Sequence, residues 1–133
     1  GDGMIKTTLP TFETSLDEKT KKLVTVDKEI VVTIDTSLFA EQRWEANFPH
    51  NAKNETLLAY IERMRDEGKI DAVHVLSHLK ALYCFLEGDD IADFKSFCQL
   101  FNTVDGKRLA LLVEKIKAVF EIILDSATTD SKN

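Results

Sequence analysis

Two histidines four residues apart are the first candidates for chemistry in this chain. At that spacing His74 and His78 would lie on one face of a helix, an arrangement that can hold zinc. Zinc proteases place a glutamate between such histidines, but here the intervening residues are Val75, Leu76 and Ser77. No third ligand is apparent. We therefore interpret the pair as a partly exposed polar stripe on an apolar helix and predict no metal site.

A cluster of carboxylates, Glu87, Asp89, Asp90 and Asp93, is the second candidate. It lacks the alternating ligands and the closing glutamate of a calcium loop. Carboxylates near a helix N-terminus interact favourably with the exposed amide groups, by roughly 0.3–1 kcal/mol each. We interpret the cluster as the start of a helix capped by Asp89 or Asp90.

The sequence also shows no pattern typical of a catalytic cysteine or serine. Cys84 and Cys98 fall inside apolar helical patterns with no histidine close in sequence, which indicates buried free thiols in a reducing compartment. The chain has no Gly-x-Ser-x-Gly turn and no glycine-rich phosphate loop. Glu62 and Asp66, four apart, fit a solvated helix face. We expect a protein that is not an enzyme, with no catalytic residue and no cofactor.

The segment 43–49 holds the single tryptophan and one of the two prolines. Phe39, Trp44 and Phe48 place three aromatic rings within ten residues, beside Arg43. Trp and Arg are over-represented at binding hot spots, so these four residues are our candidates for protein interaction. The alternative is that Trp44 and Phe48 anchor a helix and the loop after it in the core. Replacing Trp44 with alanine separates the two: loss of binding with intact helix indicates the first, unfolding the second.

Length and charge narrow the class of protein. At 133 residues we expect one domain. The net charge is −6 and no basic patch is apparent, which argues against nucleic-acid binding and suits a protein that meets other proteins. No run of about 18 apolar residues predicts a membrane-spanning helix.

The first part of the chain predicts β-structure. Residues 1–3 look like an expression scar, and residues 4–22 predict an extended arm with an edge strand at most at 11–14, because Pro10 disfavours a central strand. Residues 23–26 and 29–34 are rich in β-branched side chains. They flank Asp27 and Lys28, so a hairpin turning there and one continuous bent strand both fit.

Helical patterns follow from residue 38 onward. We expect helices at 38–47 (capped by Thr36 or Ser37), from an Asn54 cap to 66 (closed by Gly68), at 72–86, at 91–102 and from 104 or 105 to 124, with a flexible tail at 126–133. The helix at 72–86 is apolar nearly all round, which is typical of a buried helix. The predicted fold is α+β and predominantly α: a bundle of four to five helices in a single domain, 23–125, with a small N-terminal β-hairpin or strand.

The order of these segments resembles the tail assembly chaperones of long, non-contractile-tailed phages and prophages of Gram-positive bacteria. The resemblance covers about residue 24 to the C-terminus and rests on length, acidity and the placement of aromatic residues. The segments that carry it are VVTIDTS at 31–37, AEQRWEANFP at 40–49, LKALYCFL at 79–86, DFKSFCQLF at 93–101 and AVFEIIL at 118–124.

The resemblance implies a scaffolding function. Members of this family coat the tape measure protein during virion assembly, keep its hydrophobic helices soluble and help to recruit tail tube subunits. Many are also made in a longer, frameshifted form. It further implies an oligomer in the cytoplasm of the bacterial host that is absent from the mature virion. It designates no individual binding residues.

Two further expectations concern partners. The strand at 29–34 has an edge that could join a strand of a neighbouring subunit, so we expect self-association. The alternative to the chaperone is a small helical adaptor or regulatory protein of a mobile element that binds one host partner.

Overall fold

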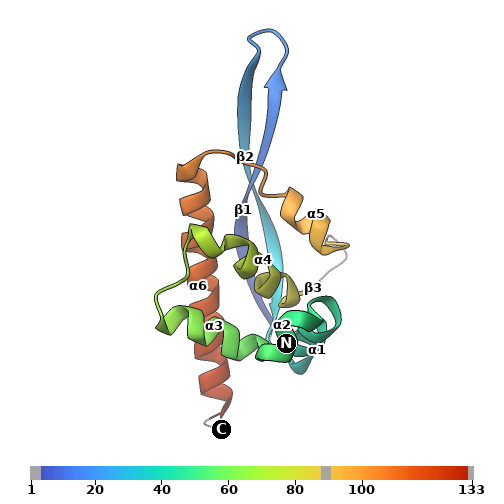
Figure 1. The fold of residues 1–133 in the computed structure, drawn as a ribbon, viewed down its shortest axis with the longest axis vertical. Coiled ribbons are helices and arrows are strands. Elements are labelled where there is room, and N and C mark those ends of the chain that lie inside the picture. The colour runs from blue at the N-terminus through green and yellow to red at the C-terminus, as the bar shows by residue number, and fades with distance from the viewer. Residues whose placement is uncertain (1–3, 88–90, 132–133) are drawn as a thin grey trace.

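A long antiparallel hairpin forms the spine of the molecule. The computed structural model describes residues 4–87 and 91–131. Strand β1 (Met4–Asp17) pairs with β2 (Lys22–Asp35) along its whole length, from Met4 opposite Asp35 to Asp17 opposite Lys22. The far end of this hairpin projects beyond all the helices (Figure 1). Most of the segment 4–22, for which we expected an extended arm with an edge strand at most at 11–14, is therefore β1.

The hairpin turns at residues 18–21, so the prediction of a turn at Asp27 and Lys28 is wrong. The Asp17 carboxylate accepts the N–H of Lys19 at 2.9 Å, and the Asp17 carbonyl accepts the N–H of Lys21 at 2.7 Å. Lys21 takes a left-handed conformation with φ of 60°. An aspartate side chain that accepts the backbone N–H two residues further on forms an Asx-turn, which is common in tight turns. The alternative of one continuous strand over 23–34 is the one that the structure confirms.

Pro10 lies inside β1 without disturbing the sheet. Phe12 donates its N–H to Leu100 at 2.8 Å and accepts from Asn102 at 3.1 Å, so its backbone groups point away from β2. Because this direction alternates along a strand, the nitrogen of Pro10 also faces away from β2. A proline at that position removes no hydrogen bond between the strands, which is why β1 is longer than Pro10 led us to expect.

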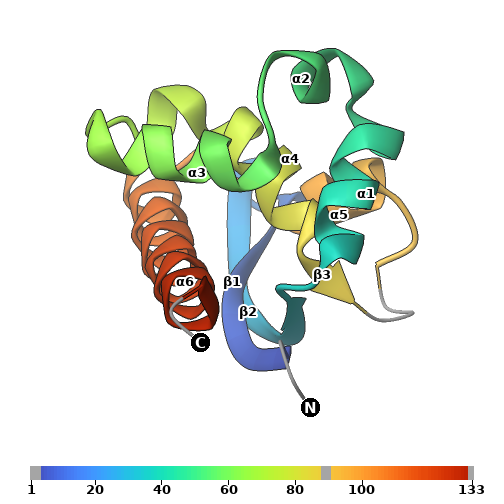
Figure 2. The same ribbon diagram turned by 90° about the horizontal axis from the view of Figure 1, so that it is seen from below.

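Six helices in the described chain pack around this hairpin. The elements after the hairpin are α1 (Leu38–Asn47), α2 (Pro49–Asn54), α3 (Leu57–Asp66), the 3-10 turn η1 (Ala72–His74), α4 (Val75–Cys84), β3 (Leu86–Glu87), α5 (Phe94–Gln99) and α6 (Gly106–Ser131). Seen end-on, α6 lies on one side of the strands and α1 and α5 on the other, while α3 and α4 cross between them (Figure 2). β3 adds two residues to β2, giving a three-stranded antiparallel sheet in the order β1-β2-β3.

The fold is α+β and mostly helical, as predicted, but the helices do not form a bundle of their own. A continuous core joins strand residues such as Leu9, Phe12 and Ile34 to residues of the helices, among them Trp44, Leu82 and Phe120. The strands are thus part of the same core as the helices. No helix within residues 4–87 or 91–131 is long and apolar enough to cross a membrane.

Several predicted helix ends are confirmed. Ser37 caps α1 by accepting the N–H of Phe39 at 3.2 Å, and α1 spans the predicted residues. Gly68, with φ of 66°, follows α3 in the left-handed conformation that a C-terminal glycine supplies. Other ends differ. Thr56, rather than Asn54, caps α3, and Asn54 ends α2, a separate short helix.

The predicted helix at 72–86 is shorter and less buried than its composition suggests. It consists of η1 and α4, and Leu86 belongs to β3. Val73 and Leu76, on its first turns, are 87% and 55% exposed. The prediction of a helix buried on nearly all sides is therefore wrong for its first turns, where apolar side chains face solvent.

The last two helices also differ from prediction. Asp93 caps α5 by accepting the N–H of Ser96 at 2.7 Å, so α5 is shorter than the predicted 91–102. Residues 88–90, which include the two expected caps Asp89 and Asp90, lie outside the described residues. The backbone of α6 continues to Ser131, where a flexible tail was expected; only residues 132–133 of that tail, like residues 1–3, lie outside the described chain.

The burial of β1 leads to the first prediction. Leu9 is fully buried, whereas Leu16, on the same strand near the turn, is 55% exposed. We expect Leu9→Ala to lower the free energy of unfolding by about 3 kcal/mol, because it leaves a cavity in the core. Leu16→Ala, the matched control, should cost less than about 0.5 kcal/mol. Urea unfolding followed by circular dichroism measures both. Equal, small effects would mean that β1 is not part of the core.

Candidate protein-binding surface

Trp44 is a core residue. Its side chain is 1% exposed, and its Nε1–H donates to the Glu55 carbonyl at 3.0 Å. Its ring lies 5.8 Å from that of Phe48 and 5.7 Å from that of Tyr60, measured between centroids. These contacts tie α1 to the segment before α3, which supports the core-anchor alternative for Trp44.

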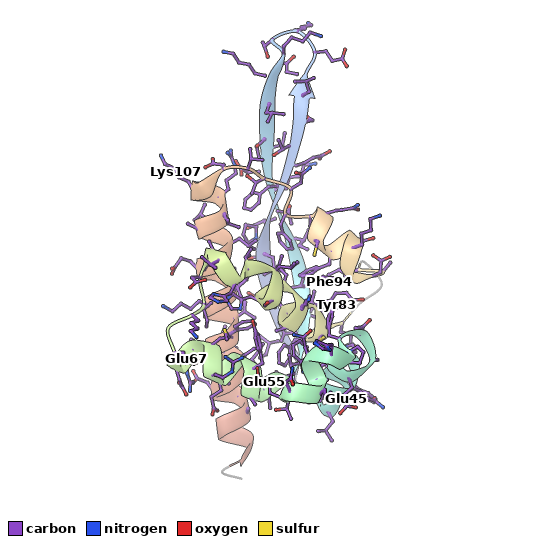
Figure 3. All side chains as sticks on the ribbon, in the orientation of Figure 1. Glu45, Glu55, Glu67, Tyr83, Phe94 and Lys107 are labelled. Atoms are coloured by element: carbon purple, nitrogen blue, oxygen red, sulfur yellow. The ribbon has the colours of Figure 1, made fainter. Side chains whose placement is uncertain are left out.

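Phe48 belongs to the same anchor and is only partly buried. Its ring meets Phe94 edge-on at a centroid distance of 5.1 Å, and Tyr83 lies 5.6 Å from Phe94 (Figure 3). The Lys80 ammonium lies 5.8 Å from the centre of the Phe48 ring. This aromatic cluster joins the end of α1 to α4 and α5.

Arg43 locks α1 to both β2 and α4. Its Nε donates to the Cys84 carbonyl at 2.6 Å, and one terminal nitrogen lies 3.3 Å from the Asp35 carboxylate. Asp35 is only 4% exposed and also accepts the N–H of Ser37 at 2.9 Å. Burial works to raise the pKa of the Asp35 carboxyl, but the hydrogen bonds from Ser37 and Arg43 outweigh it and hold that pKa below its usual value.

Phe39 is the one predicted interaction residue that faces solvent. It is 64% exposed, and its neighbour Leu38 is 87% exposed. Together with Ser37, Glu41, Gln42 and Glu45, they line an open depression on the outer face of α1, which we call the α1 surface. The spacing of the aromatic residues pointed to Phe39 but not to Leu38. The signal for Leu38 is its place directly after the predicted cap, as an apolar residue in the first turn of the helix.

The α1 surface is acidic as well as apolar. Glu45 lies at the outer side of α1 (Figure 3) and is exposed. The Glu41 carboxylate turns inward and accepts the N–H groups of Leu57 and Leu58 at 2.9 and 3.0 Å. It thereby satisfies two of the free amide groups at the start of α3 and fixes α1 against that helix. Of the residues that the structure describes, no lysine or arginine lines the depression. Its chemistry therefore suits an apolar side chain flanked by positive charge.

The histidine pair does not make a metal site among the described residues. His78 is fully buried, not partly exposed as we expected. Its Nε2–H donates to the Lys69 carbonyl and its Nδ1 accepts from the Tyr60 hydroxyl, both at 3.0 Å, so neither nitrogen is left for a metal. His74 turns to Asp71 at 2.7 Å. No group of three or more potential ligands occurs anywhere in residues 4–87 and 91–131.

Burial shifts the pKa values of three side chains in the core, His78, Tyr60 and Cys84. Desolvation lowers the pKa of His78 and raises the pKa of Tyr60 to about 12. Burial likewise raises the pKa of the Cys84 thiol to about 12, which makes it a poor nucleophile at neutral pH. These groups are those of a packed core.

Comparison with known proteins adds no identification: no family model, no curated protein and no solved structure matches this chain.

The Arg43 contacts lead to the second prediction. Arg43→Met leaves the buried Asp35 carboxylate without its counter-charge and the Cys84 carbonyl without its donor, so we expect a loss of about 2 kcal/mol of unfolding free energy. Arg65→Met is the control: its partner Asp66 is largely exposed, with 59% of the side chain accessible, and such pairs contribute under about 1 kcal/mol. Chemical denaturation checks both. A cost no larger than that of the control would show that Arg43 does not hold the three elements together.

His78 leads to the third prediction. Because its pKa is lowered in the folded protein, the unfolded chain binds a proton more readily below pH 6.5, the ordinary value. Stability should therefore fall as the pH drops below about 6.5, by at most about 1.4 kcal/mol per pH unit from this group. His78→Gln should flatten the dependence between pH 6.5 and 5, while His74→Gln should retain it. Unfolding curves at several pH values test this, and a flat wild-type profile would contradict it.

Proposed function

We propose that this protein is an assembly chaperone of phage tails that binds and solubilises the tape measure protein. The observation that carries the proposal is the α1 surface, where Leu38 and Phe39 are 87% and 64% exposed beside Glu45. Two large adjacent apolar side chains left in water are what a binding surface for an apolar partner requires. The resemblance of the sequence to tail assembly chaperones supplies the identity of that partner.

The α1 surface suits transient binding of an amphipathic helix. Such a helix would place one apolar side chain between Leu38 and Phe39, and a lysine or arginine one turn away would face Glu45. The contact is small, so a single site binds weakly. Many copies along one long helical partner would cover its apolar stripe while each remains exchangeable, as a solubilising coat requires.

The wider role follows from the same proposal. A coat on the tape measure protein would bring tail tube subunits to it, through a longer frameshifted form if one is made. We place this activity in the cytoplasm of the bacterial host, before the virion is complete. The net charge of −6 favours solubility of a protein with exposed apolar side chains.

Co-expression with the tape measure protein tests the proposal and gives the fourth prediction. The wild type should keep the tape measure protein soluble and co-elute with it. Leu38→Ser with Phe39→Ser should reduce the co-eluting amount at least tenfold, because both apolar contacts are lost, while circular dichroism stays unchanged. The matched control is Val73→Ser with Val104→Ser, which removes two residues that are 87% and 80% exposed elsewhere on the surface.

A wild type that neither binds nor solubilises the tape measure protein would exclude the chaperone. The second candidate, an adaptor of a mobile element that binds one host protein, would then use the same α1 surface. If the control pair and the α1 pair lose binding equally, the α1 surface is not the specific site.

A further inference from the structure

We infer that two copies of this chain pair through the free edge of β2, antiparallel, about a two-fold axis at Val26. This inference does not depend on the role in tail assembly. It rests on the backbone direction in β2, on which part of its edge is covered, and on the order of charges along the strand.

The backbone of β2 offers a row of hydrogen-bonding groups to a partner strand. Asp35 donates its N–H to the Phe85 carbonyl at 2.6 Å, on the side away from β1, so odd-numbered residues of β2 point their backbone groups to that side. Thr33 uses these groups on β3. Within the described chain, β2 has no other partner on this side, which leaves Leu23, Thr25, Asp27, Glu29 and Val31 directed outward.

The side chains along this edge are accessible. Leu23, Val24, Val26 and Val31 are 61%, 43%, 47% and 66% exposed. The distal half of β2 belongs to the part of the hairpin that projects beyond the helices, and Lys107, at the start of α6, marks where that projection begins (Figure 3). A two-stranded ribbon that extends into water is marginally stable on its own, and exposed strand edges pair readily with other strands. A second copy would convert two such ribbons into one four-stranded sheet.

The charges select one register for a pair of identical strands. A two-fold axis through the sheet places one residue opposite its own copy. An axis at Asp27, Lys28 or Glu29 would oppose like charges directly, which is unfavourable. An axis at Thr25 would place Lys22 opposite Lys28. An axis at Ile30 would bring Asp27 against Thr33, whose outward groups are already bonded to β3.

An axis at Val26 meets none of these obstacles. It pairs residues 22–30 with the same residues of the second copy and sets Val24 opposite Lys28 and Lys22 opposite Ile30, so that lysine stems cover valine and isoleucine. Leu23 faces Glu29 and Thr25 faces Asp27, and these pairs exchange backbone hydrogen bonds. Asp27, which Arg108 of its own chain binds at 2.6 and 2.8 Å, faces the uncharged Thr25 there rather than its own copy.

Disulfide trapping tests the register, in the fifth prediction. The backbone of Val26 points toward β1, so the two Val26 residues would form a non-hydrogen-bonded pair with Cα atoms about 4.5 Å apart, within disulfide range. Val26→Cys should give a covalent dimer under mild oxidation. Glu29→Cys should not, because its copy would lie six residues along the strand, about 20 Å away. The wild type controls for Cys84 and Cys98. Trapping at Glu29 but not at Val26 would overturn the register.

Charge pairing tests the interface without a new covalent bond. The wild type should elute as a dimer, whereas Val26→Lys and Val26→Asp should each elute as monomers, with the dimer weakened at least tenfold by like charges on the axis. Mixing the two variants should restore the dimer, which also shows that both are folded. A monomeric wild type at its highest soluble concentration, or no recovery on mixing, would overturn the inference.

Discussion

The pairing of β1 with β2 is the constraint on which the rest of the structure depends. The two ends of this hairpin differ in what they contact. At the end formed by the start of β1 and the end of β2, Leu9, Val32 and Ile34 are buried, and the helices pack on them. At the other end the ribbon leaves the helices behind. Because alternate residues face opposite sides, the register of this single pairing decides which side chains meet the core.

Asp35 and Arg43 transmit that constraint to the helices. Asp35 ends β2, and its carboxylate accepts the N–H of Ser37, the cap of α1, and also binds Arg43, six residues after Ser37. Arg43 then reaches the end of α4. Glu41 connects α1 to α3, because its carboxylate accepts the N–H groups of Leu57 and Leu58. The contacts of Arg43 and Glu41 and the burial of Trp44 fix the orientation of α1. In this orientation Leu38 and Phe39 face solvent.

The sequence predicted the local features well where one residue type has one physical use. Ser37 as a cap and Gly68 as a left-handed end follow from backbone chemistry that needs no tertiary information. The overall class, α+β and mostly helical, follows from the periodicity of the apolar residues. The anchoring of Trp44 was one of two alternatives that composition alone leaves open, because a tryptophan suits both a core and an interface.

The errors arose where a distant contact decides. Pro10 lowered the expectation of a strand, yet its nitrogen faces away from β2, and only the pairing shows that. Asp27 resembled a turn residue but lies within β2, where its charge is matched by Arg108 from α6, 81 residues away in sequence. His78 appeared polar and exposed, but Tyr60 and the Lys69 carbonyl satisfy it inside the core. None of these partners is adjacent in sequence, so no local pattern could reveal them.

We propose that the α1 surface receives an amphipathic helix of a partner protein. The most direct measurement is an NMR titration of the labelled protein with soluble helical fragments of the tape measure protein. We expect the largest amide shift changes at residues 38–45, with β2 and α6 little affected. Saturating shift changes centred on another element, or no change at millimolar fragment, would contradict it.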